Sequence, residues 1–324
     1  MVAPAFDRDR LGRYRIERLL GRGAMGAVVL GRDTHSGIHG GRLAAIKTLS
    51  LSDEFSVDER VEARQRFFRE AEAARRLQHP DIVAVYDAGE TDGLAFIAME
   101  YIEGHDLQRH TEPGQWLPLP QVVHIGRRVA SALAHAHRQG VVHRDIKPAN
   151  VMIDLAADVV KVTDFGIARI TDACRTKTGM VLGTPIYMSP EQLSGQHVDG
   201  RSDLYSLGVT LFQLLTGVLP HRTESMARLM YCIVNEAAPD VRTLRPEVPT
   251  ALAQVLARAL AKSPAARHAD GLQLAQALGA VAALWPGDTS VAPDGTSAAG
   301  TPEVDVCAST VTLSRPDPGH NSGL

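Results

Sequence analysis

The chain has 324 residues and a net charge of −3, with 44% hydrophobic and 22% charged residues, the balance of an ordinary globular protein. It is long enough for one large domain or two small ones with a substantial core. The near-balanced charge does not indicate nucleic-acid binding. Three widely spaced cysteines exclude a disulfide framework and a CxxC metal site, and they fit a reducing compartment.

Two stretches bear on membrane insertion and secretion. The N-terminal segment 1–15 lacks the apolar core of a secretory signal. The most apolar stretch, 204–220, is too short for a membrane span and contains two glycines, so it predicts a buried core helix. We therefore expect a cytoplasmic protein without membrane insertion.

The N-terminal part of the chain alternates short β-like runs with turns. One helix interrupts them, from about Val57 to Leu77, and His79-Pro80 ends it. The β-like runs are 14–21, 27–33, 43–49, 81–90 and 94–101.

From Leu119 onward the pattern is mainly helical, interrupted by short apolar pieces at 141–145, 150–154 and 159–166. The fold class predicted is α+β with two lobes, a small β-rich N-lobe with one helix and a larger, mainly helical C-lobe. After Trp285 the chain has no aromatic residue and is rich in Pro, Gly, Ser, Thr and Asp, which predicts disorder. The expected divisions are an N-terminal arm at 1–13, a folded domain at 14–284 with lobes 14–102 and 103–284, and a tail at 285–324.

The sequence GRGAMG at 21–26 fits the spacing GxGxxG, which occurs in dinucleotide-binding turns and in other phosphate-binding loops. A dinucleotide turn needs a helix directly after the glycines, whereas the apolar run 27–30 predicts a strand. We therefore expect a strand–turn–strand hairpin whose backbone N–H groups cover phosphates. The alternative is a hairpin without a ligand, and a dinucleotide-binding oxidoreductase is disfavoured.

Lys47 ends an apolar strand with a cation, which can reach into water or bind phosphate oxygens if a carboxylate fixes it. The next helix offers Glu70 and Glu72. Glu70 shares its face with apolar residues at i−3, i+4 and i+7, whereas Glu72 has arginines at helical-neighbour spacing. We expect Glu70, on the inward stripe, to be the partner of Lys47.

The strongest motifs are HRDIKPAN and, further along the chain, DFG. Transfer of a γ-phosphoryl group requires positioning, cations that neutralise charge, and an acceptor for the hydroxyl proton. Asp145 can accept that proton, and Lys147 can neutralise the phosphate. Asn150 and Asp164 carry oxygen donors suited to Mg²⁺.

Taken in order, these motifs resemble the protein kinase superfamily, in particular the bacterial Hanks-type Ser/Thr kinases, over roughly residues 14–284. The matching pieces are GRGAMGAV, AAIK, the helix residue Glu70, MEYIEG, HRDIKPAN, DFGIAR, GTPIYMSPE and DLYSLG. Lys147-Pro148 and GTPIYMSPE resemble the Ser/Thr branch rather than the Tyr branch. The resemblance implies transfer of the γ-phosphate of ATP, with Mg²⁺ or Mn²⁺, to Ser/Thr hydroxyls of protein substrates.

The resemblance also implies an ATP site between the glycine-rich hairpin and the segment that joins the lobes. Met99 would be the gatekeeper, and Glu100 and Ile102 would contact adenine through their backbone. The implied ATP-binding residues are Leu20, Gly21, Arg22, Gly23, Ala24, Met25, Gly26, Val28, Ala45, Lys47, Glu70, Met99, Glu100, Ile102 and Met152.

Two further pairs match structural positions of the family. Glu191 and Arg267 correspond to its structural ion pair. Asp203 corresponds to the aspartate that supports the catalytic loop, with His137 as its buried partner. His143 of the loop is expected to be a packed residue rather than a base.

Regulation is expected on the loop after DFG. Arg144 and Arg169 are two arginines beside the active site that can anchor a phosphate on this loop. Thr176 and Thr178 match positions phosphorylated in similar bacterial kinases, which implies activation by autophosphorylation. The alternative is that both are ordinary exposed threonines.

One alternative function and two partners complete the expectations. A pseudokinase-like scaffold that binds nucleotide and partner proteins usually lacks one of the four residues Lys47, Asp145, Asn150 and Asp164, and this chain has all four. The Thr-rich stretch 308–316 is either a target for phosphothreonine-binding domains or inert. The family also implies a transient homodimer through the N-lobe.

Overall fold

The computed structural model describes residues 9–23, 26–35, 41–49, 57–165 and 185–285. All of these belong to one unit of the chain. The predicted tail lies outside the described residues except for Trp285, so its disorder stays a prediction.

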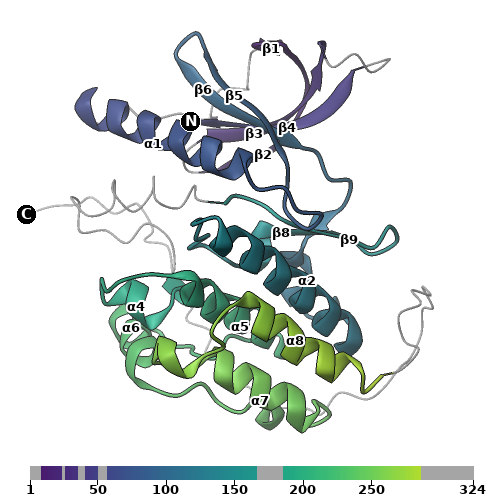
Figure 1. Cartoon of the computed structure of the whole chain (residues 1–324), viewed down its shortest axis with the longest axis vertical. Helices are drawn as coiled ribbons and strands as arrows, with labels where there is room; N and C mark the ends of the chain where they lie inside the picture. Colours follow the sequence, from purple (N-terminus) through teal and green to yellow (C-terminus); the bar gives the residue numbers. More distant parts are fainter. Residues whose placement is uncertain (1–8, 24–25, 36–40, 50–56, 166–184, 286–324) are drawn as a thin grey trace, which may run out of the picture. The chain divides into compact units, whose positions relative to one another are not determined.

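The N-terminal part is a six-stranded antiparallel sheet with strand order β1-β2-β3-β4-β6-β5 (Figure 1). The strands are β1 Arg10–Leu11, β2 Tyr14–Gly23, β3 Gly26–Asp33, β4 Arg42–Leu49, β5 Val85–Thr91 and β6 Leu94–Glu100. Helix α1, Val57–Arg75, follows β4. The glycine-rich sequence thus joins two strands, as predicted, and the structure has no helix directly after it that would face a pyrophosphate.

Side chains alternate along β4 between the two faces of the sheet. Ala44 and Ile46 are buried in a core with Leu11 and Tyr14, whereas Leu49 is buried with the apolar stripe of α1. That stripe is Ala63, Phe67 and Ala71. Because residues two apart share a face, Lys47 lies on the same side of the sheet as α1.

One predicted strand boundary is wrong, and part of the predicted arm joins the sheet. The arm assigned to 1–13 includes β1, which pairs with β2 and buries Leu11 completely. The β-like run 81–90 becomes a strand only at Val85, because residues 81–83 bond to the chain around Val162 instead: Asp81 O accepts from Val162 N, and Val83 N donates to Val162 O.

The C-terminal part is mainly helical, as predicted, and carries a three-stranded sheet ordered β7-β8-β9. The strands are β7 His105–Asp106, β8 Val151–Asp154 and β9 Val159–Val162. The α-helices are α2 Leu119–Arg138, α4 Pro190–Leu193, α5 Gly200–Thr216, α6 Met226–Asn235, α7 Thr250–Ala259 and α8 Gly271–Ala282. No helix of the described residues is long and apolar enough to cross a membrane.

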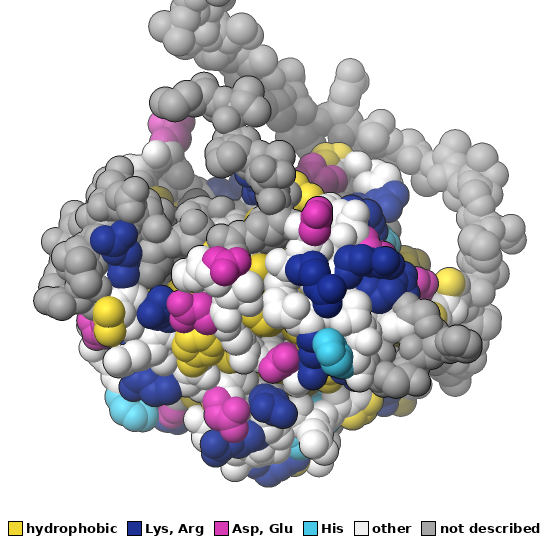
Figure 2. Space-filling view, turned by 90° about the horizontal axis from the view of Figure 1, so that it is seen from above, with side chains coloured by type: hydrophobic (Ala, Val, Ile, Leu, Met, Phe, Trp, Pro, Cys, Tyr) yellow, Lys and Arg dark blue, Asp and Glu magenta, His cyan; other side chains and the backbone are white. Residues whose placement is uncertain are grey.

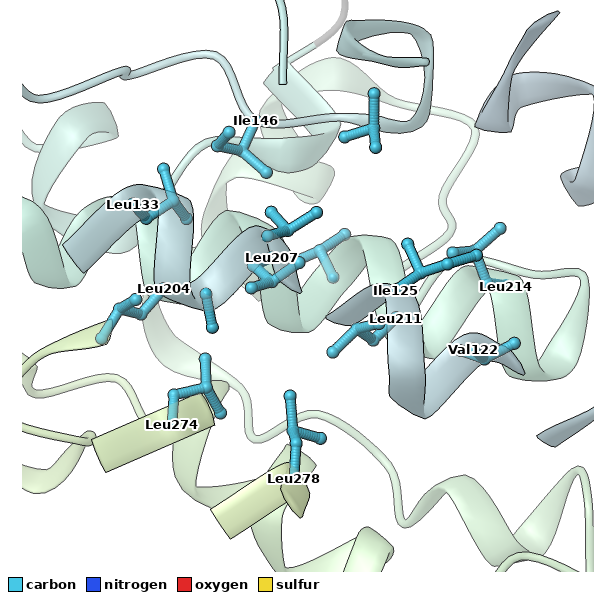
Figure 3. Close-up of a cluster of buried hydrophobic side chains, with 14 of the residues drawn as sticks. Val122, Ile125, Leu133, Ile146, Leu204, Leu207, Leu211, Leu214, Leu274 and Leu278 are labelled. Carbon is cyan, nitrogen blue, oxygen red and sulfur yellow. The ribbon is translucent and has the colours of Figure 1, made fainter. Parts of the chain in front are cut away.

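Helices α2, α5 and α8 enclose the main core, which Figure 3 shows as leucine and isoleucine side chains meeting between them. The predicted core helix 204–220 corresponds to most of α5. Asp199 caps its N-terminus by accepting from Arg201 N, and Gly217 ends it in the left-handed conformation at φ 71°. The helix that presents Asp203 therefore has fixed ends and a buried body.

The surface seen from above carries Lys and Arg side chains interspersed with Asp and Glu where described residues form it (Figure 2). Charged side chains of the N-terminal part form ion pairs, such as Arg32 with Glu17 at 2.5 Å, between two strands, and Arg64 of α1 with Glu90 of β5 at 3.0 Å. Exposed pairs of this kind contribute little to stability, usually below about 1 kcal/mol.

Candidate active site

The glycine-rich hairpin is closed by Gly23 opposite Gly26. Gly26 has φ 153°, and a Cβ there would lie 2.0 Å from the backbone oxygen of Thr48. Only glycine fits, because the hairpin lies directly against β4. Ala24 and Met25, which lie between Gly23 and Gly26 in the sequence, are outside the described residues.

Val28, Ala45 and Lys47 lie on one face of the sheet. Val28 is the cross-strand partner of Lys47, and Ala45 is two residues before it on β4. All three are half-buried, while the alternate residues Ala44 and Ile46 are buried on the other face. Val28 and Ala45, two of the implied ATP-binding residues, therefore line the same surface as the predicted phosphate-binding lysine.

The ammonium group of Lys47 pairs with Asp164, with Nζ 2.8 Å from Oδ2. This joins the N-terminal sheet to the segment that follows β9. Glu70 is half-buried on α1, whereas Glu72 is exposed and pairs with Arg76 at 3.5 Å. The helix periodicity therefore separated the two glutamates correctly, and the pairing of Glu70 with Lys47 stays a prediction.

The side chains of Lys147 and Asn150 both donate to the carboxylate of Asp145. Asp145 Oδ2 accepts from Lys147 Nζ at 2.8 Å and from Asn150 Nδ2 at 3.0 Å. The same Nδ2 donates to the backbone oxygen of Asp145 at 2.7 Å. The amide nitrogen of Asn150 is thus used within the loop, which directs its Oδ1 away from Asp145.

Asn150 and Asp164 lie on neighbouring segments of the backbone. Thr163 N donates to Asn150 O at 2.9 Å, and Val151 is the cross-strand partner of Val162. A carboxylate and an amide oxygen are donors of the kind that Mg²⁺ binds. The residues present therefore fit a magnesium ion held together with nucleotide phosphates.

Asp203 holds the loop that carries Asp145. Its carboxylate accepts from the backbone N–H of His143 at 2.8 Å and of Arg144 at 2.7 Å, and its Oδ2 lies 2.7 Å from His137 Nε2. Asp203 is completely buried. Arg144 has φ 69° and Asp164 φ 61°, which non-glycine residues rarely adopt, so surrounding contacts must hold both.

His143 is completely buried and uses both ring nitrogens. Asp145 N donates to Nδ1 at 3.3 Å, and Nε2 lies 2.7 Å from the backbone oxygen of Thr163. This requires the neutral ring with its proton on Nε2. Its ring also contacts Phe165 at 4.7 Å between centroids, so the geometry is that of a packed residue and not of a base.

Glu191 and Arg267 form a buried bidentate pair, with both nitrogen–oxygen distances 2.7 Å. Ser202 adds a hydrogen bond to Glu191, and the Arg267 guanidinium lies 5.0 Å from the Tyr205 ring centre. Burial raises the pKa of the Glu191 carboxyl, but the hydrogen bonds from Arg267 and Ser202 outweigh it and leave the pKa below its usual value. The carboxylate is therefore ionised and paired.

The segment joining the two parts contains a residue pair that the motifs do not reveal. Glu100 N donates to Ala84 O, and the Glu100 carboxylate accepts from Ala84 N and, at 2.8 Å, from Lys161 Nζ. Lys161 is also the cross-strand partner of Met152. A lysine within the apolar strand VVKV was the available sequence signal, because a cation there requires a partner.

Besides Ala24 and Met25, three predicted site residues lie outside the described residues. They are Arg169, Thr176 and Thr178, so the predictions for the loop after DFG are not tested by the structure.

The family model for the protein kinase domain matches residues 14–278, and the chain belongs to this family. This confirms the predicted family and the two-lobed fold.

Individual relatives and a solved structure are similar to most of this chain. The chain is 42% identical to the serine/threonine-protein kinase pkn3 of Myxococcus xanthus, over 79% of this chain and 48% of that protein. It is 40% identical to the serine/threonine-protein kinase PrkC of Bacillus subtilis, over 79% and 38%. The crystal structure of the PknI kinase domain of Mycobacterium tuberculosis superposes with a TM-score of 0.64 at 34% identity, covering 86% of this chain and 99% of that one. The chain thus spans about half the length, or less, of these two curated relatives.

Proposed function

We propose that this protein is a Ser/Thr protein kinase that transfers the γ-phosphate of ATP to hydroxyl groups of protein substrates. One observation carries the proposal: Lys147 and Asn150 both donate hydrogen bonds to the carboxylate of Asp145. Asn150 is in turn bonded to Thr163, the residue directly before Asp164. The names of the relatives support the same activity.

Each residue has a defined task in this proposal. Asp145 accepts the proton of the substrate hydroxyl, and Lys147 neutralises the transferred phosphate. Lys47 holds nucleotide phosphate oxygens and is itself held by Asp164. Asn150 and Asp164 would bind Mg²⁺, which supplies charge neutralisation at the phosphates when bound. We propose Mg²⁺ as the divalent ion, with Mn²⁺ as the alternative.

The pseudokinase-like scaffold is the second candidate function. The presence of all four residues that such scaffolds usually lack in part, Lys47, Asp145, Asn150 and Asp164, argues against it. Intact-mass analysis after incubation with Mg·ATP, with a generic protein substrate, separates the two functions. The proposal expects phosphate on the substrate with the wild type and almost none with Asp145→Asn. Labelling by the variant at the wild-type rate would refute the role of Asp145.

Regulation and partners are further parts of the proposal. We expect autophosphorylation at Thr176 and Thr178, with Arg144 and Arg169 binding the new phosphates. Peptide mapping after incubation with Mg·ATP tests this, and an unmodified loop in an active sample would contradict it. A transient homodimer through the N-lobe, a phosphothreonine-binding partner and a cytoplasmic location are expectations from the family.

A further inference from the structure

Arg128 lies within α2, and its guanidinium contacts two segments that are distant in sequence. Nε and Nη2 both donate to Asp81 Oδ1, at 2.9 and 2.5 Å. Nη1 donates to the backbone oxygen of Asp158 at 2.5 Å and lies 3.1 Å from its Oδ1. Asp81 precedes β5, and Asp158 lies in the turn between β8 and β9. One side chain therefore joins three elements.

This pair is buried, unlike the surface pairs of the protein. The side chain of Asp81 is 8% exposed and that of Arg128 is 19% exposed, compared with 56% and 72% for Glu72 and Arg76. A buried carboxylate that loses its cation is left uncompensated at high cost. The contact between Arg128 and Asp81 is therefore a strong constraint on the position of Asp81.

The backbone of the Asp81 segment is bonded to the end of β9. Val162 N donates to Asp81 O at 2.9 Å, and Val83 N donates to Val162 O at 3.0 Å. Ile82 and Val162 form a parallel bridge. Val162 is two residues before Asp164, whose φ of 61° depends on its surroundings. Fixing Asp81 therefore fixes the chain immediately before Asp164.

The same segment is also anchored on its other side. Ile82 is buried in the main core and Val83 in the core shared with α1. Ala84 O accepts from Glu100 N, at the end of β6. Residues 81–84 thus connect α1, β6 and β9, and Arg128 is the side chain that ties this connection to α2.

We propose that Arg128 is a positioning residue for phosphoryl transfer. It acts through Asp81 and Val162, and it holds Asp164 at the place where that carboxylate receives Mg²⁺ and Lys47. The inference rests on the proposed kinase function, because it assigns a role to Arg128 within that reaction. Arg128 itself is not expected to contact nucleotide or substrate.

Three variants test the proposal: Arg128→Met, Arg128→Met/Asp81→Asn and Arg128→Lys. Arg127→Met is the matched control, because Arg127 is the exposed neighbour on the same helix. Arg128→Met should lower kcat about tenfold or more and raise the Mg²⁺ concentration for half-maximal rate several-fold, since small displacements at a reacting centre are costly. Hydrogen exchange should accelerate in 81–84 and 159–163. Arg127→Met should match the wild type in all three measurements.

The double variant Arg128→Met/Asp81→Asn separates positioning from stability. It leaves no buried charged carboxylate without its cation, because Asp158 is 73% exposed, so its unfolding midpoint should recover most of what Arg128→Met loses, while kcat and the Mg²⁺ requirement stay impaired. Recovery of the rate together with stability would overturn the proposal. So would a kcat within twofold of wild type for Arg128→Met.

Arg128→Lys keeps the inference testable if the double variant does not fold. A lysine retains the charge but cannot bridge Asp81 and Asp158 with a planar fork, so an intermediate rate and Mg²⁺ requirement are expected. Wild-type values for both would overturn the proposal.

Failure of the proposed function is recognised separately, because the wild type would then show no transfer at all. In that case the Mg²⁺ dependence of ADP binding, measured by calorimetry, tests whether Arg128 positions Asp164. Arg128→Met should require several-fold more Mg²⁺ than wild type and Arg127→Met, and an unchanged requirement would overturn it.

Discussion

Replacement of Asp203 by asparagine is the most informative single perturbation of the catalytic loop. The carboxylate accepts from two backbone N–H groups, of His143 and Arg144, and contacts His137 Nε2. An amide of the same shape has one acceptor oxygen and an NH₂ group, so at least one of these buried donors faces another donor. Asp203 is completely buried, so water cannot replace the lost bond.

The cost follows from the bonds that are lost. A buried unsatisfied donor costs about 1–3 kcal/mol, and hydrogen bonds to charged groups contribute about 1.5–3 kcal/mol each. We expect Asp203→Asn to lower the free energy of unfolding by about 2–4 kcal/mol. Because these bonds hold the loop with Asp145, kcat should fall by about tenfold or more at temperatures where the variant stays folded.

Urea unfolding and steady-state phosphorylation of a generic substrate measure the two effects. Glu72→Gln is the control, because its exposed pair with Arg76 contributes little. A variant Asp203→Asn with unchanged stability and unchanged kcat would refute the reasoning that the carboxylate fixes the loop.

Three further predictions test other parts of the structure. Arg267→Met leaves the buried Glu191 carboxylate without its cation and should destabilise the protein by about 3–5 kcal/mol in urea unfolding; a change below about 1 kcal/mol would contradict this. Gly26→Ala should raise the KM for ATP and lower kcat, because a Cβ meets Thr48 O at 2.0 Å; wild-type kinetics would contradict it. Burial, and to a lesser extent Arg258, lower the pKa of His268 to about 4 from 6.5. The unfolded state therefore binds more protons, and His268 should cost about 2 kcal/mol of stability as the pH falls from 7 to 5. His268→Gln should flatten that slope in urea unfolding at the two pH values, and an unchanged slope would contradict it.

The parts of the site that were predictable from sequence depend on short spacings. Asp145, Lys147 and Asn150 lie within six positions, so a single loop brings them together once its motif is identified. The choice of Glu70 over Glu72 for the inward face needed only helix periodicity. The glycine hairpin followed from the apolar run after Gly26.

The contacts that were not predictable join residues far apart in the sequence. Arg128 and Asp81 are 47 positions apart, and Lys161 and Glu100 are 61 apart. The strand VVKV indicates that Lys161 needs a partner but not which one, whereas Arg128 and Asp81 taken alone are compatible with solvated surface charges. Only the folded chain shows the partners and their burial. The same long-range bonding of residues 81–84 made the predicted strand 81–90 begin four residues too early.

The Mg²⁺ dependence of nucleotide binding and transfer in Asp145→Asn and Asp164→Asn tests the central claim most directly. The proposed mechanism assigns proton acceptance to Asp145 and metal binding to Asp164. It predicts that Asp145→Asn binds ADP with a near-wild-type Mg²⁺ requirement but transfers almost no phosphate, whereas Asp164→Asn loses Mg²⁺-dependent binding and transfer together. Equal losses of Mg²⁺-dependent binding in both variants, or wild-type transfer by either, would contradict it.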